Sequence, residues 1–409
     1  MRVLFLHNNF PAQYLHLSQL LAADPDNTVV FGTKHTENVQ LAGVHKVNFA
    51  PSREPTPNIH HYVRNYESAV LHGQAVYRLA EQLKASGFVP DVVSAHSGWG
   101  VGMFIKDAFP DAGYLAYCEW FGQAHGSDAD FDPAFPMTPD DVLRIRAGNA
   151  PMLVDLYSCD RGLAPTLWQR DQFPPEFHSK ISVLHDGVDT DYFFPDPAQK
   201  MLLINERGET ILDLSEEEEI ITYVSRGMDA YRGFPQFIQA LGLVLERRPK
   251  AHVVIVAADR IAYGPAAPEG NSFKDYMLKQ VPLDLSRVHF VGNLPYGLYK
   301  LVLRASSVHV YLTRPFVLSW SFMEAMASGC LIVASDTPPV REMMQDGING
   351  LLVDFFAVER IGDRICDALE HRKDMQPIRD AARQTIVEHY AQKTLLPKHV
   401  ELLRELTGS

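Results

Sequence analysis

Short apolar runs of the strand type alternate with longer amphipathic stretches along the whole chain. In the first half the runs are RVLFL, TVVFG, DVVSA and GYLAYC, and in the second half they are IITYVS, HVVIVA, VHFVG, SVHVYL and LIVAS. Continuously apolar runs are typical of strands buried on both faces of a parallel sheet, with helices formed by the stretches between them. The pattern predicts an α/β protein with two Rossmann-like sheets.

A segment that resists regular structure separates the two series of strands. It reads SKISVLHDGVDTDYFFPDPAQK, in which a last strand is followed by a turn, aromatics and two prolines. We therefore predict one Rossmann-like domain at residues 1–194 and a second at residues 195–385, with a cleft between them. The final amphipathic stretch, residues 386–409, is expected to cross back to the N-terminal domain.

Composition narrows the class of partner and the compartment. A formal net charge of -13 argues against a nucleic-acid-binding surface and favours a small partner. The four cysteines lie far apart without CxxC spacing, which fits reduced thiols and a cytoplasmic location; they are Cys118, Cys159, Cys330 and Cys366. No segment approaches the roughly 20 apolar residues of a spanning helix. Any membrane contact is therefore expected to be peripheral, at the inner membrane face.

The ends of the predicted strands carry the candidate binding residues, because ligands of doubly wound sheets bind beyond the carboxyl ends of the strands. In the first half nine residues share this position: His7, Asn8, Asn9, His96, Gly98, Trp99, Gly100, Glu119 and His125. The glycines allow close approach to the backbone, and Trp99 offers a flat face for a sugar ring. Local turns, caps and tight helix packing explain these residues equally well. A GxGxxG dinucleotide fingerprint is absent.

Two arginines at a strand end form a stronger candidate. Arg226 and Arg232 stand in SRGMDAYRGF, after the strand IITYVS and before the helix FPQFIQALGLVL. Guanidiniums supply forked donors, and a helix N-terminus adds partial positive charge. In an acidic chain this placement predicts an anion site.

A second candidate in the same half is a loop, TRPFVLSWS, that leads into the helix WSFMEAMASG. The backbone amides at its end are expected to point at a diphosphate; they belong to Val317, Leu318, Ser319 and Trp320. Glu324 lies inside the helix, where a carboxylate can accept hydrogen bonds from both vicinal hydroxyls of a ribose. An ordinary solvent-facing glutamate is the alternative, but its apolar neighbours disfavour it, and a buried acid requires a partner.

Together these motifs resemble the family 4 glycosyltransferases, retaining enzymes of the GT-B fold, in which two Rossmann-like domains face each other across a cleft. The resemblance rests on HDGVDTDYFFP, SRGMDAYRGF, VHFVGNLPYGLYKLVLRASSVHVYLT, FMEAMASGCLIVASD and DGINGLLVD, in that order. In the first half, where the acceptor is expected to bind, NNFPAQ and HSGWG are similar to a bacterial subgroup associated with surface polysaccharides.

The resemblance also implies roles for the donor-side residues. Arg226 and Arg232 would bind the donor diphosphate, and Glu324 would hold the ribose. Asn293 and Leu294 fall where the nucleotide base is cradled.

Two positions depart from the family pattern. Glu119 falls where many members have a histidine near the transferred sugar. Phe316 replaces the acid that usually stands eight residues before Glu324 and contacts the hydroxyls of the donor sugar. We expect an altered sugar pocket with the leaving-group machinery intact.

The expected activity is retaining transfer from a nucleotide-diphosphate sugar, the co-substrate, to a glycan, lipid-linked or small-molecule acceptor. No cofactor is expected, and metal-independent activity is predicted because the resemblance makes a divalent cation unnecessary. Two alternatives stay open. One is another GT-B enzyme, a phosphorylase or an epimerase; the other is a catalytically degenerate protein that binds a nucleotide sugar or scaffolds a partner.

Overall fold

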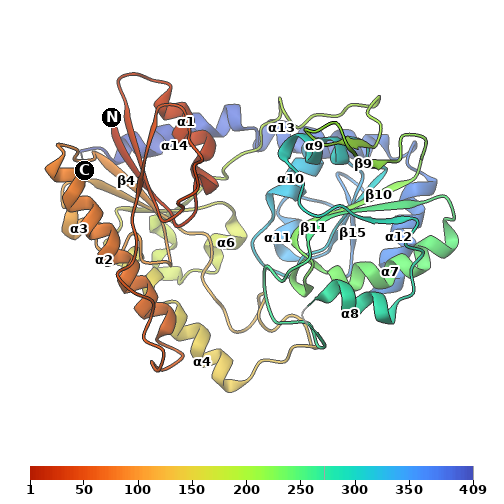
Figure 1. Ribbon diagram of the computed structural model, residues 1–409, viewed down its shortest axis with the longest axis horizontal. Helices are drawn as coiled ribbons and strands as arrows, with labels where there is room; N and C mark the ends of the chain where they lie inside the picture. The colour runs from red at the N-terminus through yellow and green to blue at the C-terminus, as the bar shows by residue number, and fades with distance from the viewer. Residues whose placement is uncertain (271, 409) are drawn as a thin grey trace. The chain divides into compact units, whose positions relative to one another are not determined.

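The computed structural model describes residues 1–270 and 272–408, and its chain divides into two compact units (Figure 1). The first unit contains Met1–Asp130, Pro136–Gly187 and the chain from Gln392 onward. The second unit contains Val188–Ala391 together with the short segment Phe131–Phe135, which comes from the middle of the N-terminal half.

A seven-stranded parallel sheet organises the first unit, with strand order β3-β2-β1-β4-β5-β6-β7. The strands are β1 Arg2–Leu6, β2 Thr28–Thr33, β3 Val44–Asn48, β4 Val92–His96, β5 Gly113–Tyr117, β6 Arg161–Ala164 and β7 Ile181–Val183. The helices are α1 Leu15–Ala22, α2 Arg64–Ala85, α3 Ile105–Ala108, α4 Pro139–Gly148, α5 Ala150–Ser158, α6 Leu167–Asp171 and α14 Gln392–Leu406, with 3-10 turns at Ala12–Tyr14 and Pro175–Lys180.

Alternate side chains of β1 belong to two separate hydrophobic clusters, as the pleat of a strand requires. Leu4 and Leu6 pack with α2 and α5, whereas Val3 and Phe5 pack with α1 and α14. Figure 1 shows α14, in blue, beside α1. The C-terminal helix therefore packs on the N-terminal sheet, as predicted.

A six-stranded parallel sheet organises the second unit, with order β12-β11-β10-β13-β14-β15. The strands are β10 Ile220–Gly227, β11 His252–Ala258, β12 Val288–Phe290, β13 Val308–Tyr311, β14 Ile332–Ser335 and β15 Leu351–Val353, and β8 Leu202–Ile204 pairs with β9 Thr210–Asp213 in an antiparallel hairpin. The helices are α7 Phe234–Arg247, α8 Phe273–Gln280, α9 Tyr296–Arg304, α10 Trp320–Ala327, α11 Pro338–Arg341, α12 Val358–Glu370 and α13 Gln376–His389, with a 3-10 turn, η3, at Ala230–Arg232.

The two faces of this second sheet are also covered by different helices. Val308 and Val310 of β13 pack with α7 and α12, whereas Tyr311 packs with α9, α10 and α13. The prediction of two parallel α/β sheets is confirmed. The pattern missed β3, β6, β15 and the β8–β9 hairpin, which are short or partly polar strands.

Candidate functional site

Arg226 and Arg232 both lie where β10 ends in the second unit. Arg226 is the second-last residue of the strand, and its side chain is exposed. Within the described part of the chain it forms no hydrogen bond or ion pair, and its guanidinium carbon lies 6.0 Å from the ring centre of Tyr263. An arginine with this freedom can reach toward an anion without first breaking a protein contact.

Arg232, in contrast, is buried and held by three neutral oxygens. Nη1 donates to the hydroxyls of Tyr311 at 3.0 Å and Thr313 at 2.6 Å, and Nη2 donates to the carbonyl of Val317 at 3.0 Å. No carboxylate of residues 1–270 or 272–408 lies within ion-pair distance of this guanidinium. Burying an uncompensated positive charge is costly, so the site favours an anionic ligand.

The turn that delivers Arg232 is organised by Asp229. Its carboxylate accepts hydrogen bonds from the backbone N–H groups of Ala262 at 3.0 Å, Tyr263 at 3.1 Å and Arg232 at 3.3 Å. Burial raises the pKa of Asp229, while these amides and the charge of Arg232 lower it. Because the carboxylate is engaged by amides, it orients Tyr263 and Arg232 without neutralising the guanidinium.

Gly233 is required where η3 passes into α7. Its φ is 64°, and a Cβ here would lie 2.5 Å from Cβ of Leu312. The left-handed conformation and the close approach both exclude a larger residue. Arg232 is thereby placed immediately before the N-terminus of α7.

The loop before α10 is only partly available to a ligand. Ser319 is the N-cap, and its hydroxyl accepts from the amide of Ser321 at 3.3 Å. The amide of Ser319, predicted to point at a diphosphate, instead donates to the hydroxyl of Tyr311 at 2.9 Å. Leu318 is buried in the core, and Trp320 is exposed. A ligand would need to displace Tyr311 to reach the amide of Ser319.

Phe316 is one of three aromatic residues gathered beside Arg232. Its ring lies edge-on to Tyr231 and to Tyr263, with centroids 5.3 Å apart in each case. The guanidinium carbon of Arg232 lies 5.9 Å from the centre of the Phe316 ring and 5.6 Å from that of Tyr263. The position where the resemblance implies an acid therefore presents an apolar, π-rich face.

Glu324 is buried, as its apolar neighbours indicated, and its partners are two tyrosines of α9. The hydroxyl of Tyr296 donates to Oε1, and that of Tyr299 donates to Oε2 at 2.7 Å. Burial raises the pKa of Glu324, and the two hydroxyls act in the opposite direction. The sequence prediction missed both tyrosines, although a pair spaced i, i+3 at the start of a helix lies on one face of it.

The two residues predicted to cradle a base lie in the turn between β12 and α9. Asn293 is exposed, and Leu294 is half-buried against the core. The turn precedes Tyr296, the first residue of α9, so it lies close in the chain to the residue that contacts Glu324.

In the first unit, the ends of β1, β4 and β5 bring together a second group of predicted residues. The rings of His96 and Trp99 are stacked with centroids 4.1 Å apart, and His7 packs edge-on to both. Glu119 lies beside them, with Oε2 3.4 Å from Nε2 of His96 and Oε1 accepting from the amide of Gln13 at 3.0 Å. We name these five residues the His96 cluster. The sequence prediction missed Gln13.

The two histidines of the His96 cluster have different hydrogen-bond partners. Burial is the main reason that the pKa of His7 lies well below its ordinary value, so His7 is neutral at pH 7. Its Nδ1 lies 2.8 Å from the amide nitrogen and 3.0 Å from the carbonyl oxygen of Asn9. Nδ1 of His96 lies 2.9 Å from the carbonyl of Ser97, which can only accept, so this nitrogen carries a proton.

Two further candidates of this half have other surroundings. Oδ1 of Asn8 is buried and has no hydrogen-bond partner within the described residues. The exposed ring of His125 contacts Asp130, 3.3 Å away in its own loop, and no contact is found between His125 and the His96 cluster. The expectation that His125 joins the other candidates is therefore not met, because the loop folds on itself.

The glycines of HSGWG have conformational and packing roles. A Cβ on Gly100 would lie 1.9 Å from the carbonyl oxygen of Ala69 in α2, so tight packing explains this glycine without a ligand. Gly98 has a φ of 98°, and its amide donates to the buried carboxylate of Asp155 at 3.2 Å. Gly98 allows the sharp turn that presents Trp99 next to His96.

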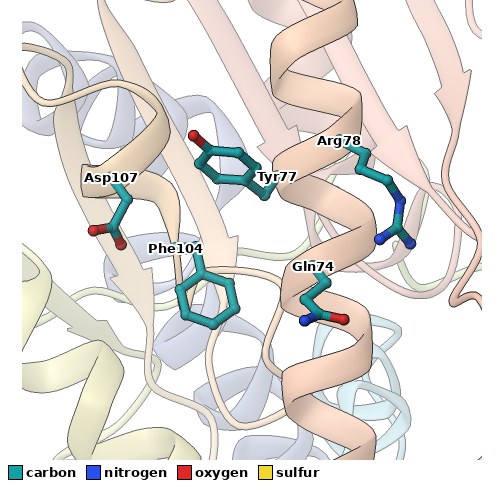
Figure 2. Close-up of a pocket in the computed structure, with 5 residues that line it drawn as sticks. All are labelled: Gln74, Tyr77, Arg78, Phe104 and Asp107. Carbon is teal, nitrogen blue, oxygen red and sulfur yellow. The ribbon is translucent and has the colours of Figure 1, made fainter.

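A hollow of the first unit lies outside both groups of candidates. Figure 2 shows the side chains of α2 and of the start of α3 around it: Gln74, Tyr77, Arg78, Phe104 and Asp107. None of these residues was predicted to bind a ligand.

The described residues contain neither a cluster of metal ligands nor a helix able to span a membrane. No three His, Cys, Asp or Glu side chains at positions 1–270 and 272–408 converge as metal ligands. Over the same positions, no helix combines the length and apolar character needed to span a bilayer.

Comparisons with known proteins agree with this architecture. Residues 25–193 match the family described as glycosyl transferase family 4 group, and residues 206–385 match the family described as glycosyl transferases group 1. No curated protein matches the chain significantly in sequence.

Solved structures resemble the whole chain at low sequence identity. Anabaena Alr3699/HepE in complex with UDP and glucose is 14% identical, with a TM-score of 0.69 over 99% of this chain and 100% of that one. Sucrose-phosphate synthase of Thermosynechococcus elongatus is 15% identical, with a TM-score of 0.72 over 99% of each chain. A glycosyltransferase of Rickettsia africae is 16% identical, with a TM-score of 0.68 over 99% and 98%. The chain therefore has the GT-B fold, joins a family 4 domain to a group 1 domain, and is a glycosyltransferase.

Proposed function

We propose that this glycosyltransferase moves a sugar from a nucleoside-diphosphate sugar to an acceptor, with retention of anomeric configuration and without a metal ion. The observation that carries the proposal is the buried guanidinium of Arg232, which has only neutral oxygen partners and lies at the same strand end as the unengaged Arg226. Support for the nucleotide comes from Alr3699/HepE, a protein of the same fold whose structure contains UDP and glucose.

In the proposed reaction, the bond between the anomeric carbon and the diphosphate oxygen breaks, and a bond from that carbon to an acceptor oxygen forms on the same face. Negative charge grows on the departing diphosphate as the sugar becomes oxocarbenium-like. Arg226 and Arg232 stabilise this charge, so they act more strongly on the transition state than on the ground state. The proton of the acceptor hydroxyl passes to the leaving phosphate oxygen, and no protein base is required.

The remaining assignments follow from position. Glu324 would bind the ribose, and Asn293 with Leu294 would cradle the base. The His96 cluster would bind the acceptor, with Trp99 as a stacking face and Glu119 as a hydrogen-bond acceptor. We also propose a surface-polysaccharide intermediate as the acceptor, because NNFPAQ and HSGWG are similar to that subgroup. The four cysteines are free, which supports a cytoplasmic location.

The phenylalanine at position 316 sets the choice of donor sugar in this proposal. An aromatic face cannot accept a hydrogen bond as a carboxylate does. The donor would therefore be a sugar that lacks or reorients the hydroxyl contacted at this position, or one whose hydroxyls are recognised by backbone amides and Glu119.

Thermal unfolding with UDP, GDP and ADP tests the donor site. A ligand present at 100 times its dissociation constant is expected to stabilise the fold by about 2.7 kcal/mol. No stabilisation by any of the three would refute the donor site. With the nucleotide that binds, Arg226→Ala is expected to slow hydrolysis of the matching nucleotide sugar by roughly 10²-fold.

Arg207→Ala is the matched control, since Arg207 is an exposed arginine of the second unit in the β8–β9 turn. Undiminished hydrolysis in Arg226→Ala would contradict the mechanism. Binding without any hydrolysis or transfer would favour the degenerate nucleotide-sugar-binding alternative.

A further inference from the structure

Glu324 accepts one hydroxyl on each of its carboxylate oxygens, and both donors come from the first turn of α9. Tyr296 donates to Oε1 and Tyr299 to Oε2. Glu324 lies on helix α10 and is 6% exposed. A buried side chain bonded at both ends of its carboxylate has a fixed orientation, because rotating it would break one bond or the other.

The two tyrosines have very different surroundings. Tyr299 is 6% exposed and forms part of the core, with Phe193 at a centroid distance of 5.9 Å. Tyr296 is 54% exposed, and its ring stacks on Tyr192 at 6.1 Å with an interplanar angle of 23°. Tyr299 therefore belongs to the permanent framework, whereas Tyr296 reaches Glu324 from the solvent side.

The hydrogen-bonding capacity of the carboxylate limits what else can bind. An ionised carboxylate has about four lone-pair sites, and the two tyrosines use two of them. The two that remain can accept two further hydroxyl groups, one on each oxygen. The 2′- and 3′-hydroxyls of a ribose form such a pair, whereas a 2′-deoxyribose supplies only one hydroxyl.

We infer that Tyr296 and Tyr299 are positioning residues that orient Glu324 toward both hydroxyls of a ribose, so that the preference of the site for a ribonucleotide over its 2′-deoxy form depends on these two tyrosines. The inference rests on the proposed function, in which Glu324 faces the ribose. It adds the two residues that fix the orientation of the Glu324 carboxylate.

The discrimination follows from a polar group left without a partner. When a 2′-deoxy nucleotide binds, one lone pair of a buried carboxylate loses its contact with water and receives no hydroxyl. A hydrogen bond to a charged group is worth enough to change affinity by roughly 10- to 100-fold. The wild-type protein is expected to prefer the ribonucleotide by about this factor.

Equilibrium binding to matched nucleotide pairs tests the inference. The ribonucleotide among UDP, GDP and ADP that binds most tightly is compared with its own 2′-deoxy form by titration calorimetry. In Tyr296→Phe we expect the preference for the ribonucleotide to fall to within about threefold. The affinity of Tyr296→Phe for the deoxy form should stay near the wild-type value, because the substitution removes no contact with that ligand.

Two further variants separate positioning from folding. Tyr77→Phe removes a hydroxyl from the hollow of the first unit and is expected to leave both affinities unchanged (Figure 2). Tyr299→Phe should reduce the preference as Tyr296→Phe does. If its buried site prevents folding, Tyr296→Phe alone decides the question, because that side chain is largely exposed.

The possible results have distinct meanings. Equal wild-type affinity for the ribo and deoxy forms overturns the inference while leaving the diphosphate site in place. An equal loss of affinity for both forms in Tyr296→Phe also overturns it, because the tyrosine would then act on the fold rather than on the ribose. If no nucleotide binds the wild-type protein, the proposed function itself fails.

Discussion

Arg314 and Asp132 form a buried ion pair, with Nη2 of the arginine 2.6 Å from Oδ2 of the aspartate. The guanidinium also lies over the rings of Tyr231 at 4.8 Å and Phe135 at 5.3 Å. The carbonyl of Arg314 accepts from the hydroxyl of Thr313, which in turn accepts from Arg232. A carboxylate from the Phe131–Phe135 segment thus supports the loop that holds the predicted diphosphate-binding arginine.

Asp132→Asn is expected to destabilise the protein by about 3–5 kcal/mol, because it leaves the buried charge of Arg314 without its counterion. Denaturation in urea, followed by a probe in the second unit, measures the change. The control is Asp363→Asn, which breaks the exposed pair with Arg247 and should leave the unfolding midpoint unchanged. A similar small effect in both variants would contradict the structural importance of the buried pair.

Phe316→Glu is expected to weaken nucleotide binding rather than improve catalysis. The ring centre of Phe316 is 5.9 Å from the guanidinium carbon of Arg232, so a new carboxylate there would compete with the donor diphosphate. We expect a loss of affinity of roughly tenfold, equivalent to about 1.4 kcal/mol, measured by calorimetric titration. Phe316→Leu carries no charge and should bind the nucleotide as the wild type does. A rise in turnover of the native donor by Phe316→Glu would contradict the proposed sugar pocket.

Asp155 is expected to make stability fall as the pH rises from about 4 to about 6. Burial raises the pKa of this carboxyl to about 6, although bonds from Ser97, Gly98 and Tyr114 oppose the shift. The folded state therefore holds the proton more tightly than the unfolded chain, and the stability gained from protonation is lost as the pH passes the folded pKa. Because the folded and unfolded pKa values of Asp155 differ by about two units, the free energy of unfolding decreases by about 3 kcal/mol over this range.

Asp155→Asn tests this pH dependence, because an amide of the same shape does not titrate. The free energy of unfolding is measured in urea at pH 4 and at pH 7 for both proteins. The decrease from pH 4 to pH 7 should be smaller in the variant by about the same 3 kcal/mol. If the free energy of unfolding decreases by the same amount between pH 4 and pH 7 in both proteins, Asp155 is not responsible for the pH dependence.

Removal of divalent ions is expected to leave nucleotide-sugar hydrolysis unchanged. In the proposed mechanism, Arg226 and Arg232 supply the positive charge that a metal ion provides in other transferases. The measurement compares rates in EDTA with rates in EDTA already saturated with magnesium. A hydrolysis rate that is lower in EDTA than in magnesium-saturated EDTA would contradict the metal-independent mechanism.

The fold was largely predictable from local sequence, and so was the position of the donor-side candidates at strand ends. Strand-type runs located β10 and β13, and the residues just beyond them included Arg232, Phe316 and Glu324. Their shared position has a physical reason, since the carboxyl ends of adjacent parallel strands meet at one edge of a sheet. Partners contributed by other elements could not be predicted in the same way.

The sequence by itself determined which residues are present at each strand end, and hence that an acidic chain places two arginines and a glutamate at one edge of a sheet. Only the tertiary structure decided how they are held. Two tyrosines of α9 donate hydrogen bonds to Glu324. Arg314 donates to Asp132, which is 182 positions away in the chain, and the amide of Ser319 donates to Tyr311. Such contacts depend on packing between distant segments, which hydrophobic periodicity does not encode.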